Sequence, residues 1–148
     1  MSVSDAYNYL KISEQLHTSG LLNEEQLQQL AGEGFKRVIN LLPLHHDYAI
    51  KNEPELVEAQ GIEYCYIPVE FDDPNDENFA AFCEAMANAG DDKLLVHCAA
   101  NYRVSGFYAM YAHQRLGWSA QQARDFIANI WNPAEHPPWD QFIDQQLK

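Results

Sequence analysis

The residues from Val96 to Ser105 hold the side chains of this chain that are best suited to nucleophilic chemistry. An apolar strand ends in a histidine and Cys98, a short polar turn follows, and Arg103 opens an amphipathic helix. A thiol in that position lies beside backbone N–H groups, a helix N-terminus and a guanidinium, and all three favour a thiolate and a bound oxyanion. The segment therefore predicts a cysteine nucleophile in an anion-binding loop, against the alternative of a plain buried core thiol.

The hydrolysis of a phosphate ester through a covalent intermediate needs what this loop supplies. A thiolate must attack phosphorus in line, while N–H donors hold the surrounding oxygens. The guanidinium fork of Arg103 can bind two of those oxygens at once, which a lysine cannot do. We therefore predict that Cys98 attacks and that the loop binds the phosphoryl group. The predicted binding residues are Ala99, Ala100, Asn101, Tyr102 and Arg103.

Three neighbours of the nucleophile have supporting roles in this prediction. Ser105 lies just inside the helix, where its hydroxyl could donate to the sulfur and help it leave in the second step. His97 is expected to orient the loop through backbone contacts rather than to act as the base. Tyr102 is the aromatic residue that we expect to touch the substrate, because its backbone belongs to the loop.

The leaving group also needs a proton donor, and three acids follow the strand predicted to end near the loop. They are Glu70, Asp72 and Asp73. Asp73 precedes a proline and is equally well explained as a turn or helix-cap residue. Asp72 has no such structural explanation, so we expect it to be the general acid, with Glu70 and Asp73 as alternatives.

Strands alternate with helices along the chain. Asn23 and Ser119, each followed three residues later by glutamine, predict helix N-caps. Helices are expected over Glu24–Ala31, from Pro54 to Gly61, over Asp76–Ala89, from Val104 to Gly117, after Ser119 and over Trp139–Lys148. Extended segments are expected near Ile12–Leu16 and over Phe35–Leu42, Ile62–Val69 and Lys93–His97. This order predicts an α/β fold with a mostly parallel sheet of four to five strands, helices on both faces and the cysteine loop at the carboxyl edge.

The length of 148 residues predicts one domain spanning residues 1–148. The formal net charge of −13 disfavours nucleic acid and anionic membranes as partners. No apolar run approaches the roughly 18 residues of a membrane span, and no secretory signal is evident. Three cysteines without metal-like spacing suit reduced thiols, so we expect a cytoplasmic protein. Composition does not indicate an oligomeric state.

The same residues resemble the cysteine-dependent phosphatases of the dual-specificity and protein tyrosine type. More closely, they resemble a bacterial family of phosphatase-like proteins with a shortened Cys-x4-Arg loop. The matching motifs occur in order over nearly the whole chain: Ser19-Gly20, Gly34–Leu41, Gly61–Val69, His97–Val104, and Trp131 with Pro133 and Trp139. The resemblance implies a dual-specificity-phosphatase-like fold, Cys98 as nucleophile, Arg103 as phosphate ligand and no cofactor. Phosphorylated proteins or small phosphoesters are the implied partners.

Two features depart from the broader phosphatase pattern. Four residues separate Cys98 from Arg103 instead of five, and Asn101 stands where a loop glycine is usual. Asparagine is the non-glycine residue that best tolerates a left-handed backbone. Val104 follows the arginine directly, and the hydroxyl comes one position later. Phosphate binding survives such changes more easily than fast turnover does.

Two other functions fit parts of the pattern. A rhodanese-like sulfurtransferase, carrying a persulfide on Cys98, also has a basic residue after a short loop. A non-catalytic phosphate-binding module would keep the loop without turnover.

A metal site at His45, His46 and Asp47 is not expected, because adjacent residues do not all point inward. Trp131, Pro133, Trp139 and Phe142 could line a cleft, but we expect them to pin the C-terminal helix to the body.

Overall fold

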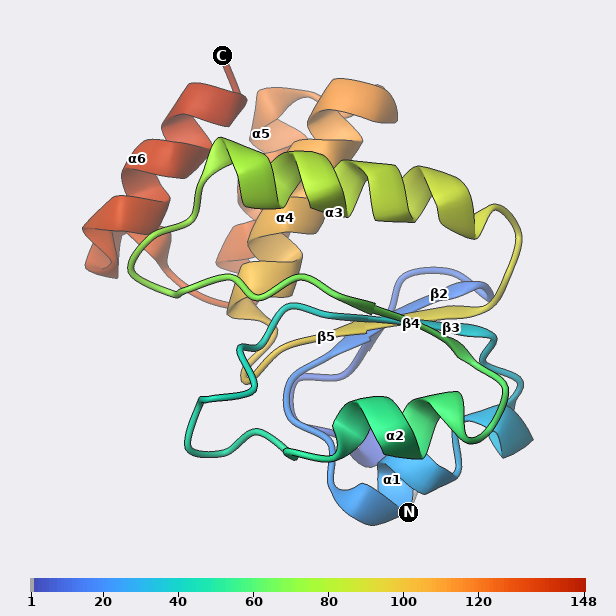
Figure 1. Cartoon of the computed structure of the whole chain (residues 1–148). Coiled ribbons are helices and arrows are strands. Elements are labelled where there is room, and N and C mark those ends of the chain that lie inside the picture. The colour runs from blue at the N-terminus through green and yellow to red at the C-terminus, as the bar shows by residue number, and fades with distance from the viewer. Residues whose placement is uncertain (1) are drawn as a thin grey trace.

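A five-stranded sheet forms the centre of the protein, whose computed structural model describes residues 2–148. The strand order is β1-β2-β5-β3-β4, in which β1 is antiparallel to β2 and all other neighbours are parallel. The strands are Leu10–Lys11 (β1), Leu16–Ser19 (β2), Arg37–Asn40 (β3), Glu63–Tyr66 (β4) and Leu94–His97 (β5). The predicted α/β class with a mostly parallel sheet is confirmed (Figure 1).

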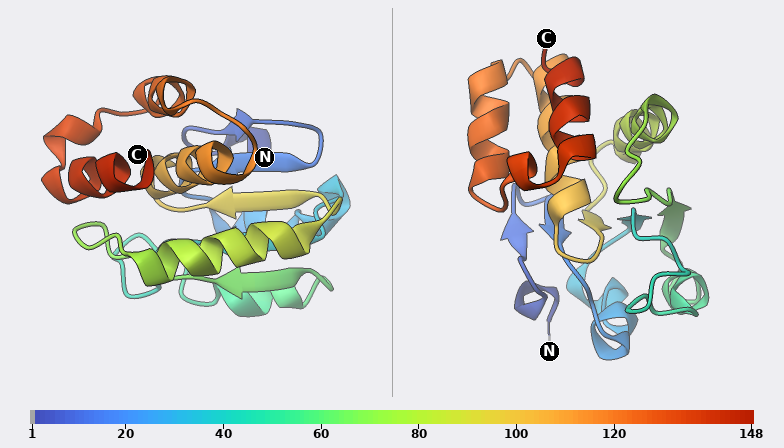
Figure 2. Two further views of the ribbon diagram at one scale, coloured as in Figure 1. Left: turned by 90° about the horizontal axis from the view of Figure 1, so that it is seen from above. Right: turned by 90° about the vertical axis from the view of Figure 1, so that its left-hand side faces the viewer.

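Helices cover both faces of the sheet (Figures 1 and 2). α1 and α2 lie on one face, and α3, α4, α5 and α6 lie on the other. The helices are Glu24–Gln28 (α1), Glu53–Glu58 (α2), Asp76–Ala89 (α3), Tyr102–Arg115 (α4), Ala120–Ala128 (α5) and Pro137–Gln146 (α6). Short 3-10 turns cover Val3–Asp5, Ala31–Glu33 and Pro133–Glu135. Each face has its own apolar core, the larger one around Phe82, Phe107 and Trp139 and the smaller one around Leu27 and Val57.

Local signals placed most helices correctly. The side chains of Asn23 and Ser119 cap α1 and α5 with the glutamines three residues on, as predicted. α1 ends at Gln28 rather than at Ala31, because the chain tightens there into a 3-10 turn. That turn ends at Gly34, whose φ of 91° is a left-handed conformation that glycine adopts without strain.

The N-terminal extended segment was predicted in the wrong place. Ile12–Leu16 is mostly a turn, in which Ser13 Oγ accepts a hydrogen bond of 3.0 Å from the backbone N–H of Leu16. The strands lie on either side of it as β1 and β2. β2 was not predicted because three of its residues have polar side chains, although all three are buried in the sheet: His17, Thr18 and Ser19.

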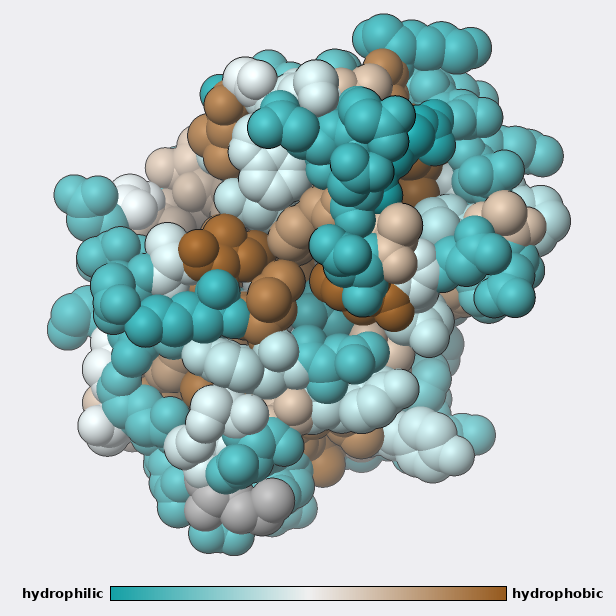
Figure 3. All heavy atoms as spheres, turned by 180° about the vertical axis from the view of Figure 1, so that it is seen from behind, coloured by the Kyte–Doolittle hydropathy of each residue, from teal (hydrophilic) through white to brown (hydrophobic). Residues whose placement is uncertain are grey.

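The parallel strands place their carboxyl ends at one edge of the sheet, where β5 leads directly into Cys98 and α4. Seen from behind, most of the surface is hydrophilic, and the largest group of apolar side chains lies across its middle (Figure 3). Within residues 2–148, no helix has both the length and the apolar character needed to cross a membrane.

Candidate active site

The loop between β5 and α4 brings Cys98 and Arg103 together, as the sequence predicted. The thiol is fully buried, and its backbone N–H donates to the Ser19 carbonyl at 3.3 Å. Arg103 is 7% exposed, and its guanidinium is close enough to Cys98 to interact with it electrostatically. Its Nε donates to the Val69 carbonyl at 2.7 Å, and its guanidinium lies 5.1 Å from the ring centre of Phe71. The Val69 carbonyl and the Phe71 ring therefore fix the position of the guanidinium.

The charge of Arg103 is in a partly desolvated position. Burial lowers the pKa of its guanidinium, and interactions with Cys98 and Glu70 oppose that change. An arginine remains a cation throughout the physiological range even so. A permanent positive charge next to a thiol in a buried loop favours the thiolate and can hold an oxyanion.

Asn101 shapes the turn before α4. Its backbone is left-handed, with φ 67° and ψ 11°, which fits its replacement of a loop glycine. Its side chain does not cap the helix. Instead, Nδ2 donates to the carbonyl of Asn8 at 2.9 Å and to Thr18 Oγ1 at 3.1 Å.

Asn8 returns this contact from the N-terminal segment. Its Nδ2 donates to the carbonyl of Ala100 at 2.9 Å, and its own backbone is also left-handed, with φ 50°. We call this reciprocal pair the Asn8–Asn101 clasp. Asn8 was not predicted from the sequence, because the two residues lie 93 positions apart and nothing local marks the pair.

Gly20 explains the Ser19-Gly20 pair of the resemblance. A Cβ atom at this position would lie 2.5 Å from the Ala99 carbonyl oxygen and 3.0 Å from the Ala100 Cα. The next backbone N–H, that of Leu21, donates to Ala99 O at 2.9 Å. The segment after β2 therefore supports the cysteine loop by backbone contact that only glycine permits.

Ser105 does not make the expected bond to the sulfur. Its hydroxyl donates its one proton to the Tyr102 carbonyl at 3.1 Å and accepts from Trp131 Nε1 at 2.9 Å. Tyr102 is the first residue of α4, and Trp131 follows α5. Its observed contacts make it a positioning residue that joins Trp131 to the first turn of α4.

His97 also differs from the expectation of backbone contacts. Its ring Nε2 donates instead to Glu53 Oε2 at 2.6 Å, and both side chains are almost fully buried. Glu53 belongs to the first turn of α2 and was not predicted from the sequence, because a glutamate in an acidic segment resembles any solvated charge.

The three candidate acids are all exposed on the segment between β4 and α3. Glu70 accepts a hydrogen bond of 2.6 Å from His45 Nε2 and is close enough to Arg103 to influence its charge. Asp72 and Asp73 line a shallow hollow with residues of α6. The side chain of Asp72 is exposed and makes no hydrogen bond among residues 2–148.

Aromatic rings surround Phe71 beside the loop. Tyr102 stacks on Trp131 with ring centres 4.8 Å apart and planes 6° apart, and His136 meets Phe71 edge-on at 4.9 Å. Trp139 is fully buried, donates to the Phe71 carbonyl at 2.6 Å and packs on α4. These contacts support the role of pinning the C-terminal helix. Tyr102 remains half-buried at the edge of the group.

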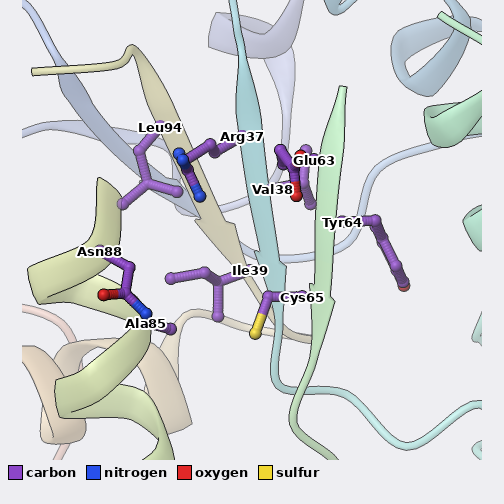
Figure 4. A pocket seen from close by; sticks show the side chains of 9 residues that line it. All are labelled: Arg37, Val38, Ile39, Glu63, Tyr64, Cys65, Ala85, Asn88 and Leu94. Atoms are coloured by element: carbon purple, nitrogen blue, oxygen red, sulfur yellow. The ribbon is translucent and has the colours of Figure 1, made fainter. Parts of the chain in front are cut away.

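A hollow of about 250 Å³ lies at the other end of the sheet, away from Cys98 (Figure 4). It opens between α3 and the sheet, near the starts of β3, β4 and β5, with Cys65 facing the helix. Burial, followed by the charge of Glu84, raises the pKa of the Cys65 thiol, which disfavours the reactive thiolate. The hollow is separate from the cysteine loop.

Metal-ligating residues do not gather in the described part of the chain, where no group of three or more histidine, cysteine, aspartate or glutamate side chains is placed to hold an ion. His45 and His46 have other partners. His45 donates to Glu70, and His46 Nδ1 accepts from the backbone N–H of Tyr48 at 3.1 Å.

The fold is the α/β fold of protein-tyrosine-phosphatase-like and dual-specificity-phosphatase-like proteins. A crystal structure from Shewanella putrefaciens CN-32, described as "Putative phosphatase (DUF442)", is 34% identical and has a TM-score of 0.82. The match covers 95% of this chain and 89% of that chain. The chain belongs to the DUF442 family, which confirms the resemblance drawn from its motifs.

More distant structures share the fold. TpbA of P. aeruginosa is 19% identical, with a TM-score of 0.74 and coverage of 94% of this chain and 84% of that one. The catalytic domain of the PP-IP phosphatase SIW14 of S. cerevisiae, in complex with citrate, is 17% identical with a TM-score of 0.74, over 94% and 85% of the two chains. No protein-family model and no curated protein sequence matched the chain.

Proposed function

We propose that this protein is a cysteine-dependent phosphatase that hydrolyses a phosphomonoester through a phosphocysteine intermediate. The observation that carries the proposal is the buried Arg103 guanidinium, which lies near the fully buried Cys98 at the N-terminus of α4. A fixed cation, loop amides and a helix N-terminus are the groups that stabilise a transferring phosphoryl group.

The reaction has two displacements. The Cys98 thiolate attacks phosphorus, the S–P bond forms, and the ester P–O bond breaks with its electron pair leaving on oxygen. A general acid gives that oxygen a proton. Water then attacks phosphorus with loss of its proton to the same group, the S–P bond breaks, and phosphate and the thiolate are released.

Asp72 is the proposed general acid. Its free, exposed carboxyl follows β4 at the same edge of the sheet as the cysteine loop. Glu70 lies nearer to Arg103 but is already bonded to His45. Substituting each acid by its amide tests the assignment: D72N should lose the basic limb of the pH–rate profile, and E70Q and D73N should keep it. Loss of that limb in E70Q alone would reassign the acid.

The proposed substrates are phosphorylated proteins or small phosphoesters. One neighbour, TpbA, has a structure in complex with phosphotyrosine. In this chain, half-buried Tyr102 and Phe71 lie beside Arg103, where a flat leaving group could pack. A cytoplasmic location is proposed from the free state of Cys65, Cys83 and Cys98.

The direct test is a phosphatase assay with an aryl phosphate, together with mass spectrometry of the denatured protein after rapid mixing. A phosphate adduct on the peptide that contains Cys98, absent from C98S, supports the proposal. Phosphate or tungstate binding without any adduct or turnover would instead identify a non-catalytic phosphate-binding module.

A sulfurtransferase is the second candidate, and the short loop favours it. With four residues between Cys98 and Arg103, the loop has one amide fewer than a phosphatase loop and suits a smaller group, such as a persulfide sulfur. Thiosulfate with cyanide tests this reading. Cys98-dependent formation of thiocyanate without any phosphatase activity would replace the phosphatase proposal.

A further inference from the structure

Asn8, far from the cysteine loop in the sequence, is bonded to that loop through both its side chain and its backbone. Its Nδ2 donates to the Ala100 carbonyl at 2.9 Å, and its own carbonyl accepts from Asn101 Nδ2 at 2.9 Å. The residue before it, Tyr7, accepts a hydrogen bond of 2.7 Å from the backbone N–H of Gly20. The segment that carries the Asn8–Asn101 clasp is therefore itself fixed to the chain that leaves β2.

The carbonyl groups of three successive loop residues all have partners. The carbonyl of Ala99 accepts from the backbone N–H of Leu21 at 2.9 Å, and that of Ala100 accepts from Asn8. The carbonyl of Asn101 accepts the first backbone hydrogen bond of α4, at 3.0 Å. Contacts from outside the loop therefore determine which way two of its peptide groups face.

Each of these carbonyls also sets the direction of the amide that follows it. In a planar trans peptide, the C=O and the next N–H point in opposite directions. The N–H groups of Ala100 and Asn101 therefore face away from the segments that bind the carbonyls. Neither of them, nor the N–H of Tyr102, has a hydrogen-bond acceptor among residues 2–148. Unpartnered amides at the start of a helix can donate to an oxyanion.

We propose that Asn8 is a positioning residue for oxyanion binding, which turns the peptide between Ala100 and Asn101 so that its N–H faces the phosphoryl group. A peptide turned the other way would present the Ala100 carbonyl oxygen, whose partial negative charge repels an oxyanion. The short loop has one amide fewer than a phosphatase loop, so each remaining donor matters more. This inference rests on the oxyanion binding in the proposed function and not on turnover.

The test measures the binding of inorganic phosphate and of tungstate to the folded protein by calorimetric titration. Asn8→Gly removes the side chain, and glycine keeps the left-handed backbone, with φ 50°, free of strain. Because the peptide is no longer held in place, N8G should bind both anions about tenfold more weakly. Equal affinities of N8G and wild type would overturn the proposal, as would wild type that binds neither anion.

Asn8→Asp is the second variant, which keeps the test decisive if N8G does not fold. It removes the donor while keeping the shape of the side chain, and it should lose at least as much affinity as N8G. Asn129→Asp is its matched control, because Asn129 is exposed and lines the same surface hollow as Asn8. N129D adds the same negative charge and should bind both anions as wild type does. An equal loss in N8D and N129D would assign the effect to charge and contradict the proposal.

Nuclear magnetic resonance separates positioning from a general loss of stability. In anion-free N8G, at a temperature where the protein is folded, the amide signals of Ala100 and Asn101 should shift or broaden relative to wild type. Unchanged signals of both amides would count against the proposal even if the affinity falls.

The failure of this inference and that of the proposed function give different results. Wild type that binds phosphate more tightly than N8G but forms no phosphocysteine adduct loses only the phosphatase reaction. Wild type that hydrolyses an aryl phosphate, while N8G binds phosphate equally well, loses only the role of Asn8.

Discussion

Single residues outside the cysteine loop hold that loop in shape. Asn8 and Asn101 tie its turn to the N-terminal segment, Gly20 lets a second stretch of backbone touch it, and the Val69 carbonyl fixes Arg103. The loop residues contribute backbone amides, one thiol and one guanidinium. Preorganisation of the site therefore depends on contacts from distant parts of the chain.

Gly20→Ala should damage the site sterically. Its Cβ would lie 2.5 Å from a backbone oxygen of the loop, which cannot move aside as a flexible side-chain end could. We expect a loss of about 1–3 kcal/mol in the free energy of unfolding and at least about a tenfold loss of phosphate affinity. Urea denaturation and calorimetric phosphate titration measure the two effects.

Gly32→Ala is the matched control for this variant. Nothing lies within 4 Å of a Cβ at that position. Its free energy of unfolding should stay within about 0.5 kcal/mol of wild type. Equal behaviour of the two variants would show that the close approach at Gly20 does not constrain the loop.

Arg103→Lys keeps the charge and removes the planar fork. We expect kcat/KM toward an aryl phosphate to fall by about 10²–10³, because the lysine cannot bind two oxygens in one plane or keep the bond to Val69. Steady-state kinetics check this, with the exposed Arg124→Lys as a variant that should retain full activity. An active R103K would show that charge alone suffices.

At the scale of elements, the β1–β2 hairpin contains a buried histidine, His17, which lies on β2. His17 Nδ1 accepts a hydrogen bond of 2.7 Å from the Tyr9 hydroxyl, and Nε2 donates to the Glu14 carbonyl at 3.1 Å. Both bonds suit the neutral ring. Burial lowers the pKa of His17 in the folded state.

That shift makes the stability of the hairpin pH-dependent. The unfolded chain binds the proton more tightly, with a pKa of about 6.5, so stability is full above that pH. It is lost as pH falls from there toward the lower folded-state pKa. Urea denaturation at a series of pH values should show wild type losing stability over this range and His17→Gln losing less. Parallel curves for the two proteins would refute this linkage.

For the molecule as a whole, the sequence determined the architecture better than it determined the site's supports. α3 has the predicted bounds, and β3, β4 and β5 lie within the predicted segments. These elements follow from periodicity and caps, which are local. Asn8, Gly20 and Glu53 contact residues far away in the sequence, and no local pattern predicts such contacts. β2 was not predicted because its buried side chains are polar, which is typical of a loop. The supports of the site are non-local contacts.

The net charge of −13 should make substrate binding depend on ionic strength. A dianionic phosphoester is repelled at long range, and Arg103 attracts it only nearby because the guanidinium is buried. Raising the ionic strength from about 0.01 M to about 0.15 M shortens the screening length from about 30 Å to about 8 Å, which weakens the distant repulsion more than the local attraction. KM should therefore fall severalfold with added sodium chloride while kcat stays constant. A KM that rises with salt would show that the positive site, and not the acidic surface, controls substrate approach.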